Sequence, residues 1–225
     1  MSQRDVTALQ AVFFDMDGLL VDSERLWFEV EREVMVRLGA EWREEDQAAL
    51  VGGSVQRTVR YMLDRSGADV DPEAVARWLL DDMADRLRSE VPLRPGAEKL
   101  LDEVIGARVP RALVSSAHRA LIDPVLDALG PDRFDVTVAG DEVRRTKPDP
   151  EPYLKAAGLL GVHPGGCVVL EDSPNGLASA EAAGCVTVAV PSVVPIPPAP
   201  GRTVVRSLYD VDLALLETLV RRARA

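Results

Sequence analysis

The sequence predicts an α/β protein in which a doubly wound parallel sheet carries an inserted, all-helical domain. Two observations support this prediction. Short valine-rich apolar segments alternate with helical patterns along most of the chain, which is the order typical of a doubly wound sheet. The first two apolar segments are separated by about one hundred residues of helical pattern, which is far more than a single crossover needs.

The predicted strands are short apolar segments bounded by glycine, proline or charged residues. Their apolar residues are continuous rather than alternating, which is typical of strands buried on both faces, as in a Rossmann-like sheet. The strands are expected at residues 11–15, 112–116, 134–139, 167–171 and 185–190, with a weaker sixth strand at 203–207. Helix-like patterns lie between them at residues 97–105, 118–129, 151–160 and 176–183.

The long interval after the first strand predicts a separate helical domain. Apolar residues recur in it at helical spacing, for example at Val30, Val34 and Leu38. It contains no convincing strand, and the proline- and glycine-containing segment 92–96 closes it. We therefore expect a helical cap domain at residues 23–91 and an α/β core domain at residues 1–22 and 92–225.

Composition and charge exclude several classes of protein. The formal net charge of −11 argues against nucleic acid and anionic membranes as partners, because both attract basic surfaces. No apolar stretch reaches the roughly 18 residues that span a bilayer, and the N-terminal residues lack the features of a signal peptide. The two cysteines, Cys167 and Cys185, stand at the starts of apolar runs, where we expect buried, reduced thiols. We expect a cytoplasmic protein that is a monomer or a weak homodimer.

Polar residues end three of the predicted strands. In open α/β sheets, ligands bind outside the carboxyl ends of the strands. These ends carry Asp15, then Ser115 with Ser116, and then Glu171 with Asp172. Side chains that end buried strands at three separate places are expected to converge on one cleft, and this constellation is a stronger signal than any single residue.

Asp15 and Asp17 are the candidate catalytic pair. A carboxylate can attack phosphorus and form an aspartyl-phosphate, which splits one slow displacement into two steps. A second carboxylate two residues on can protonate the leaving oxygen and later activate water. Gly18 permits the tight turn that brings both side chains to one ligand. The alternative is that this tetrapeptide is only a strand-ending turn.

Three other positions complete the candidate site. Glu171 and Asp172 offer the hard oxygen ligands that suit Mg²⁺, although they can also form a solvated turn that caps the next helix. Lys147, one of only three lysines, lies between a threonine and a proline and can neutralise phosphoryl oxygens, although most lysines simply face solvent. Ser115 can donate a hydrogen bond to a phosphoryl group, although such serines usually bond to backbone.

Taken together, these segments resemble the four motifs of the haloacid dehalogenase superfamily. They are the segment 15–24 (DMDGLLVDSE), Ser115, the segment 147–150 (KPDP) and the segment 171–176 (EDSPNG), and they occur in the family's order. The helical insert directly after the first motif is similar to the cap of the β-phosphoglucomutase-like branch, which also contains many sugar-phosphate phosphatases.

The resemblance implies a role for each matching residue. Asp15 is then the nucleophile and a Mg²⁺ ligand, and Asp17 is the general acid/base whose backbone carbonyl also binds the ion. Asp172 is implied as a further Mg²⁺ ligand, with Glu171 binding or supporting the ion. Ser115, with the adjacent Ser116, and Lys147 are implied to bind the transferring phosphoryl group. Because true dehalogenases lack the second aspartate, the resemblance favours phosphate-ester chemistry.

The sequence departs from the mutases of that branch at the positions that grip a second phosphate. The mutase arginine follows a glycine-rich turn in the cap, but here Val55 follows Gly52-Gly53-Ser54. Trp27 takes the place of a histidine, and Ala117-His118-Arg119 replaces Ser-Lys-Asn. Arg57, Arg60 and Arg119 can compensate, and Trp27 can border the substrate pocket or belong to the core of the cap.

These departures favour hydrolysis of a small phosphorylated metabolite, such as a hexose phosphate, with Mg²⁺ as the cofactor. The first alternative is a phosphohexomutase of the β-phosphoglucomutase type, which returns the phosphate to the sugar. The second is a catalytically silent regulator that binds a phosphorylated metabolite, although both Asp15 and Asp17 are present. The exact substrate depends on cap residues that face the cleft, which a single sequence does not identify.

Overall fold

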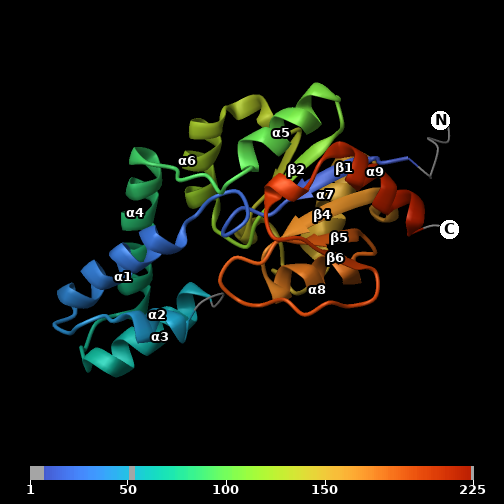
Figure 1. Ribbon diagram of the computed structural model, residues 1–225. Coiled ribbons are helices and arrows are strands. Elements are labelled where there is room, and N and C mark those ends of the chain that lie inside the picture. Colours follow the sequence, from blue (N-terminus) through green and yellow to red (C-terminus); the bar gives the residue numbers. More distant parts are fainter. Residues whose placement is uncertain (1–7, 51–53, 224–225) are drawn as a thin grey trace.

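The computed structural model describes residues 8–50 and 54–223 and contains a six-stranded sheet in which every pairing is parallel. The strand order is β3-β2-β1-β4-β5-β6, so the chain first winds outward from β1 in one direction and then returns to build the other half. The predicted doubly wound α/β fold is confirmed (Figure 1).

Each strand lies within or next to the segment predicted for it. The sixth strand begins one residue earlier than predicted. It is also shorter, because it ends at Val204. The strands are β1 (Ala11–Phe14), β2 (Arg111–Val114), β3 (Val136–Val138), β4 (Cys167–Glu171), β5 (Val186–Ala189) and β6 (Arg202–Val204).

Side chains of β1 alternate between the two faces of the sheet, and both faces are covered by helices. Val12 and Phe14 belong to one apolar cluster, together with α5 (Ala97–Gly106), α6 (Arg119–Leu129) and α9 (Leu213–Arg222). Ala11 and Phe13 belong to a second cluster, with α7 (Glu151–Leu160) and α8 (Pro174–Ala182). The two-residue period of a strand therefore explains why its whole sequence is apolar.

The chain between β1 and α5 forms a helical region that lies to one side of the sheet (Figure 1). Its helices are α1 (Glu24–Arg37), α2 (Glu44–Ala48), α3 (Val55–Ser66) and α4 (Pro72–Ser89). Within it, α4 packs against α1 and α3, and it also packs against α6 of the α/β part. All four helices fall inside the predicted cap segment, whose boundaries at residues 23 and 91 stay a prediction.

The chemistry-bearing loops all leave the same edge of the sheet. The register pairs Phe14 of β1 with Leu113 on one side and Leu170 on the other. The residues that follow these three positions are therefore neighbours at the carboxyl ends of the strands, beside the helical region. No helix in the described part of the chain is both long and apolar enough to cross a membrane.

Candidate active site

Lys147 lies at the centre of the site and joins two neighbouring strands. Its ammonium nitrogen Nζ lies 2.6 Å from Oδ1 of Asp15, 2.6 Å from Oε1 of Glu171 and 2.8 Å from the carbonyl oxygen of Val114. The side chain is only 5% exposed. Burial favours the neutral amine, but the carboxylates of Asp15 and Glu171 outweigh it and raise the pKa of Lys147, so the lysine stays charged.

Asp15 follows β1 directly and is buried. Its backbone N–H donates to the carbonyl oxygen of Leu170, 3.1 Å away, which continues the sheet pairing and fixes its position beside β4. Burial, followed by the nearby carboxylate of Glu171, raises the pKa of Asp15 well above its usual range, while Lys147 works in the opposite direction. An additional positive charge at this point would therefore favour the ionised form that a nucleophile needs.

Glu171 is completely buried and is held by donors from three directions. Oε1 accepts hydrogen bonds from Lys147 and from the Tyr153 hydroxyl at 2.7 Å, and Oε2 accepts one from the Ser173 hydroxyl at 3.1 Å. A Cβ atom at Gly176 would lie 1.8 Å from Oε1, so only glycine fits there. Because both oxygens already have protein donors, Glu171 is better suited to positioning Lys147 than to binding a metal ion itself.

Asp17 lies in the turn after β1 and shares the cavity with Asp15. The Ser23 hydroxyl donates to its Oδ1 at 2.8 Å, and the Ser115 hydroxyl lies 3.4 Å from Oδ2. Burial raises the pKa of Asp17 despite these two hydrogen bonds, which work to lower it. A raised pKa favours the protonated carboxyl group, which is the form that a general acid needs.

The turn itself depends on Gly18. Its φ angle is +81°, a left-handed conformation that side chains with a Cβ adopt at a cost. A Cβ atom at this position would also lie 2.0 Å from Oδ2 of Asp172. The predicted tight turn is therefore present, and it brings the loop after β1 into close contact with the loop after β4.

Three acidic side chains could hold a divalent cation. Asp15, Glu171 and Asp172 each place a carboxylate oxygen within 4.8 Å of the others. Burial and the charge of Glu171 raise the pKa of Asp172 to about 7, although the Ser192 hydroxyl and Lys147 lower it. Since Asp15 and Asp172 line the cavity, whereas Glu171 is completely buried with donors on both oxygens, Asp15 and Asp172 are the better candidate ligands. Clustered carboxylates with raised pKa values are the environment that a hard cation stabilises, so this set of donors fits one.

These groups open into a cavity of about 830 Å³ between the sheet edge and the helical region. Most predicted site residues line it, including Ser116 and Lys147 from the α/β part and Trp27 and Arg57 from the helical region. Three residues not singled out from the sequence also line it on the helical side: Glu24, Glu31 and Gln47. The cavity therefore joins the charged groups at the sheet edge to a lining that the helices complete.

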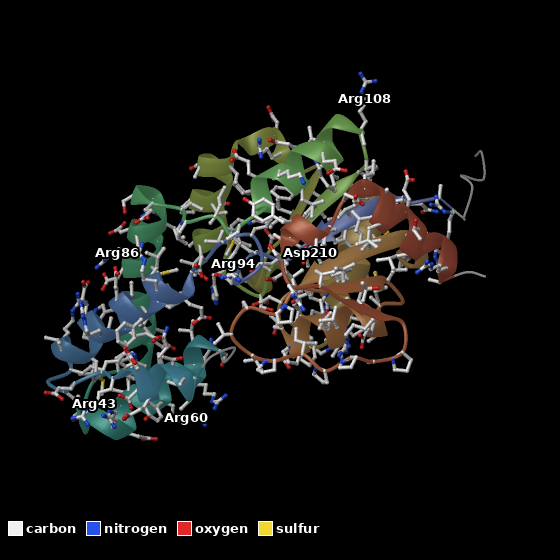
Figure 2. All side chains as sticks on the ribbon, in the orientation of Figure 1. Arg43, Arg60, Arg86, Arg94, Arg108 and Asp210 are labelled. Carbon is white, nitrogen blue, oxygen red and sulfur yellow. The ribbon has the colours of Figure 1, made fainter. Side chains whose placement is uncertain are left out.

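The predicted candidate Arg119 does not line this cavity. The Arg119 guanidinium is held by Glu142 and by the Thr137 hydroxyl, and the neighbouring His118 lines the cavity instead. Gly52 lies outside the described residues. Arg60, named as a compensating arginine, is exposed at the lower edge of the helical region (Figure 2).

Comparison with protein families identifies the family to which a chain with this fold and these site residues belongs. Residues 12–190 match the model of the haloacid dehalogenase-like hydrolases, a span that contains every charged group described above. The chain belongs to the haloacid dehalogenase-like hydrolases. The family resemblance and the expectation of an enzyme are thereby confirmed, and the family implies a divalent metal, which the carboxylates of Asp15 and Asp172 fit.

Several haloacid dehalogenase-like relatives carry names that describe phosphatases. The chain is 34% identical to fructose-1-phosphate phosphatase YqaB of Escherichia coli, over 77% of this chain and 92% of that protein. It is 33% identical to the phosphorylated carbohydrates phosphatase of Thermotoga maritima, over 78% of this chain and 82% of that protein.

Solved structures of haloacid dehalogenase-like proteins have the same architecture. CbbY from Rhodobacter sphaeroides in complex with phosphate superposes with a TM-score of 0.83 and is 26% identical, covering 93% of this chain and 99% of that one. A mutant of the same protein in complex with xylulose-(1,5)bisphosphate superposes with a TM-score of 0.82.

Sequence reasoning missed three residues that position the charged groups. Tyr153 donates to Glu171, Ser23 donates to Asp17, and Ser192 donates to Asp172. Ser23 lies within the first motif segment, 15–24, which was a usable signal. Tyr153 lies one helical turn after the 147–150 segment, and Ser192 lies in the loop after β5, so neither could be linked to its partner without the fold.

Proposed function

We propose that the protein hydrolyses small phosphate monoesters, and sugar phosphates in particular, through an aspartyl-phosphate on Asp15 with Mg²⁺ bound. The observation that carries the proposal is the placement of Lys147 against both Asp15 and Glu171 at the closed end of the cavity. The names of the relatives from Escherichia coli and Thermotoga maritima support a sugar phosphate as the substrate.

In the first step, a carboxylate oxygen of Asp15 attacks phosphorus, and the bond between phosphorus and the sugar oxygen breaks. Asp17 donates its proton to that oxygen, so that the sugar leaves as a neutral alcohol. Lys147 neutralises charge on the phosphoryl oxygens, and the Ser115 hydroxyl, which lies close to Asp17, donates to one of them. Bound Mg²⁺ would neutralise further charge on Asp15 and on the phosphoryl group.

In the second step, the Asp17 carboxylate accepts a proton from a water molecule that attacks the phosphoryl group. The bond between phosphorus and Asp15 breaks, and inorganic phosphate leaves with Asp15 regenerated. Burial raises the pKa of Asp17, and a raised pKa makes the carboxylate a better acceptor of the proton from water. The Ser23 hydroxyl keeps this carboxyl group oriented.

The helical region forms the roof of the site in this proposal. It contributes Trp27, Arg57 and the acidic side chains opposite the sheet edge. A roof of this kind excludes bulk water while the phosphoryl group is transferred and opens to release product. We assign residues 23–91 to it as the cap, with residues 1–22 and 92–225 as the core.

The proposal is tested with the Asp15→Asn variant, assayed for Mg²⁺-dependent phosphate release from an aryl phosphate. Loss of turnover is expected, because an amide cannot attack phosphorus to form the acyl-phosphate. The matched control is Asp22→Asn, seven positions further on, where the side chain is exposed and pairs with Arg94. Full turnover in Asp15→Asn would overturn the mechanism.

Two further measurements separate the alternatives. A phosphohexomutase converts glucose 1-phosphate to glucose 6-phosphate with little free phosphate, so both products are measured in the same reaction. A silent regulator binds a phosphorylated metabolite without turnover. Phosphate release that accounts for all of the consumed substrate supports the hydrolase.

A further inference from the structure

One face of α1 looks into the cavity and takes no part in the phosphate chemistry described above. Glu24, Trp27 and Glu31 are spaced three and four residues apart, which places them on the same side of a helix. All three line the cavity. They form a row that starts close to Asp17, whose charge contributes to the raised pKa of Glu24, and extends into the helical region.

Glu31 is an unusual residue to find at this position. It is 7% exposed, yet no arginine or lysine within the described residues forms an ion pair with it. The Trp42 indole N–H donates to its Oε2 at 3.2 Å. Burying a carboxyl group with so little compensation is costly, and such residues are commonly kept for binding.

The other two residues of the row, Glu24 and Trp27, also offer binding groups to the cavity. The Gln47 amide donates to the backbone carbonyl oxygen of Glu24 at 2.9 Å and lies 3.4 Å from Oε2, which orients the Glu24 side chain. Trp27 lies between the two glutamates and presents an aromatic surface to the cavity. An aromatic face between two hydrogen-bonding carboxyl groups matches a sugar, which has an apolar face of C–H groups and an edge of hydroxyl groups.

We infer that Glu24, Trp27 and Glu31 bind the leaving group, and that they select phosphate monoesters with an uncharged, hydroxyl-rich leaving group over bisphosphates and over leaving groups without hydroxyls. This inference rests on the proposed function and specifies the substrate class of the same site. A second phosphate group on the substrate would meet two glutamates, and repulsion between like charges disfavours it. Arg57 is the one arginine that lines the cavity among the described residues, and it donates to the carbonyl oxygen of Ala49.

A phosphorylated amine is the competing ligand class, because carboxylates and tryptophan also bind cations. The protonation state of Glu31 favours hydroxyl groups. Burial raises the pKa of Glu31 to about 7 and also raises the pKa of Glu24. A carboxyl group that is partly protonated near neutral pH can donate as well as accept a hydrogen bond, as a hydroxyl partner requires, and it attracts a cation less strongly.

The test is steady-state kinetics of the Mg²⁺-loaded enzyme on four probes: a hexose monophosphate, a hexose bisphosphate, an aryl phosphate and phosphoethanolamine. For the unmodified enzyme, kcat/KM is expected to be at least about tenfold higher for the hexose monophosphate than for the other three, because unpaired polar groups penalise a substrate without hydroxyls. Equal or faster turnover of the bisphosphate or of phosphoethanolamine would overturn the inference.

Variants on α1 test whether the preference for hexose monophosphate depends on the residues that face the cavity. Glu31→Gln and Glu24→Gln are expected to lower the ratio of kcat/KM for hexose monophosphate to that for aryl phosphate by about tenfold or more, mainly through KM. Glu33→Gln is the matched control, because Glu33 is on the same helix but is half exposed and pairs with Arg86. Glu24→Gln covers the case in which Glu31→Gln does not fold, since Glu24 is only partly buried.

The outcomes separate this inference from the proposed function. An unchanged ratio in both variants would overturn the role of the α1 face while leaving the hydrolysis intact. Absence of phosphate release from all four probes would instead contradict the proposed function itself. An equally large decrease of the kcat/KM ratio in Glu33→Gln would also count against the inference. It would show that the decrease is not specific to the face of α1 that lines the cavity.

Discussion

The ammonium group of Lys147 lies 2.6 Å from the carboxylate of Asp15 and, at the same distance, from the carboxylate of Glu171. One buried cation thus serves two buried carboxylates on adjacent strands, β1 and β4. The arrangement keeps the candidate nucleophile next to a positive charge before any substrate arrives. It also links the stability of the protein to the integrity of the site.

Replacing Lys147 with methionine is expected to lower the free energy of unfolding by about 3–5 kcal/mol, because two buried carboxylates lose their shared partner. Urea denaturation at neutral pH measures the change. Lys155→Met is the control: its ammonium group is partly exposed and bonds to the carbonyl oxygen of Glu142, so a change below about 1 kcal/mol is expected. Equal losses of unfolding free energy in the two variants would show that the burial of Lys147 adds nothing to its contribution to stability.

Removing the hydroxyl group of Ser23 is expected to shift the titration of Asp17. The hydroxyl donates to the carboxylate and so lowers the pKa of Asp17. In Ser23→Ala, the limb of the pH–kcat profile that reports Asp17 should move upward by about one pH unit. Ser89→Ala, whose hydroxyl only bonds to the Arg86 carbonyl oxygen on the surface, should leave the profile in place. A downward movement in Ser23→Ala would contradict the assigned hydrogen bond.

Two glycines in helices should respond in opposite directions to alanine. At Gly176 in α8 a Cβ atom would lie 1.8 Å from Glu171, so Gly176→Ala is expected to lose about 1–3 kcal/mol of stability together with activity. At Gly158 in α7 nothing lies within 4 Å, so Gly158→Ala should gain about 0.5–1 kcal/mol. Thermal unfolding of both variants checks the pair. Equal effects would mean that the close approach to Glu171 is not a constraint.

Mg²⁺ should stabilise the protein more at high pH than at low pH. Burial raises the pKa of Asp172 from 3.8 to about 7, so the folded protein without metal holds a proton there that the unfolded chain releases above pH 4. Its stability therefore falls as the pH rises from about 4 to about 7. A cation competes with that proton, so the rise in Tm on adding Mg²⁺ should be larger at pH 8 than at pH 5.

The comparison with Asp172→Asn completes this measurement. Without the carboxylate, the additional rise in Tm at pH 8 should disappear. A rise of the same size at both pH values in the unmodified protein would show that the cation does not bind where Asp172 titrates.

The sequence was sufficient to predict the sheet and most of the residues that meet at its edge. Buried parallel strands are recognisable because both faces must be apolar, and the residue after each strand is placed by the topology alone. This is why the sequence alone predicts that Asp15, Ser115 and Glu171 meet at one edge of the sheet.

The cap side of the cavity could not be predicted in the same way. Glu24 and Glu31 occur on an amphipathic helix with several other acidic residues, and only the packing of α1 shows which of them face inward. Arg119 illustrates the opposite case, since nearness in sequence to Ser115 suggested a role in binding but its guanidinium is used by Glu142 and Thr137. Sequence spacing places side chains along one element, whereas a cavity is formed between elements.

The most direct test of the central claim is mass spectrometry of enzyme that is quenched with acid during turnover of a hexose monophosphate with Mg²⁺. The account predicts one additional phosphoryl group on the peptide that contains Asp15, and none in Asp15→Asn. A phosphoryl group on another residue, or rapid turnover with no labelled peptide, would contradict it.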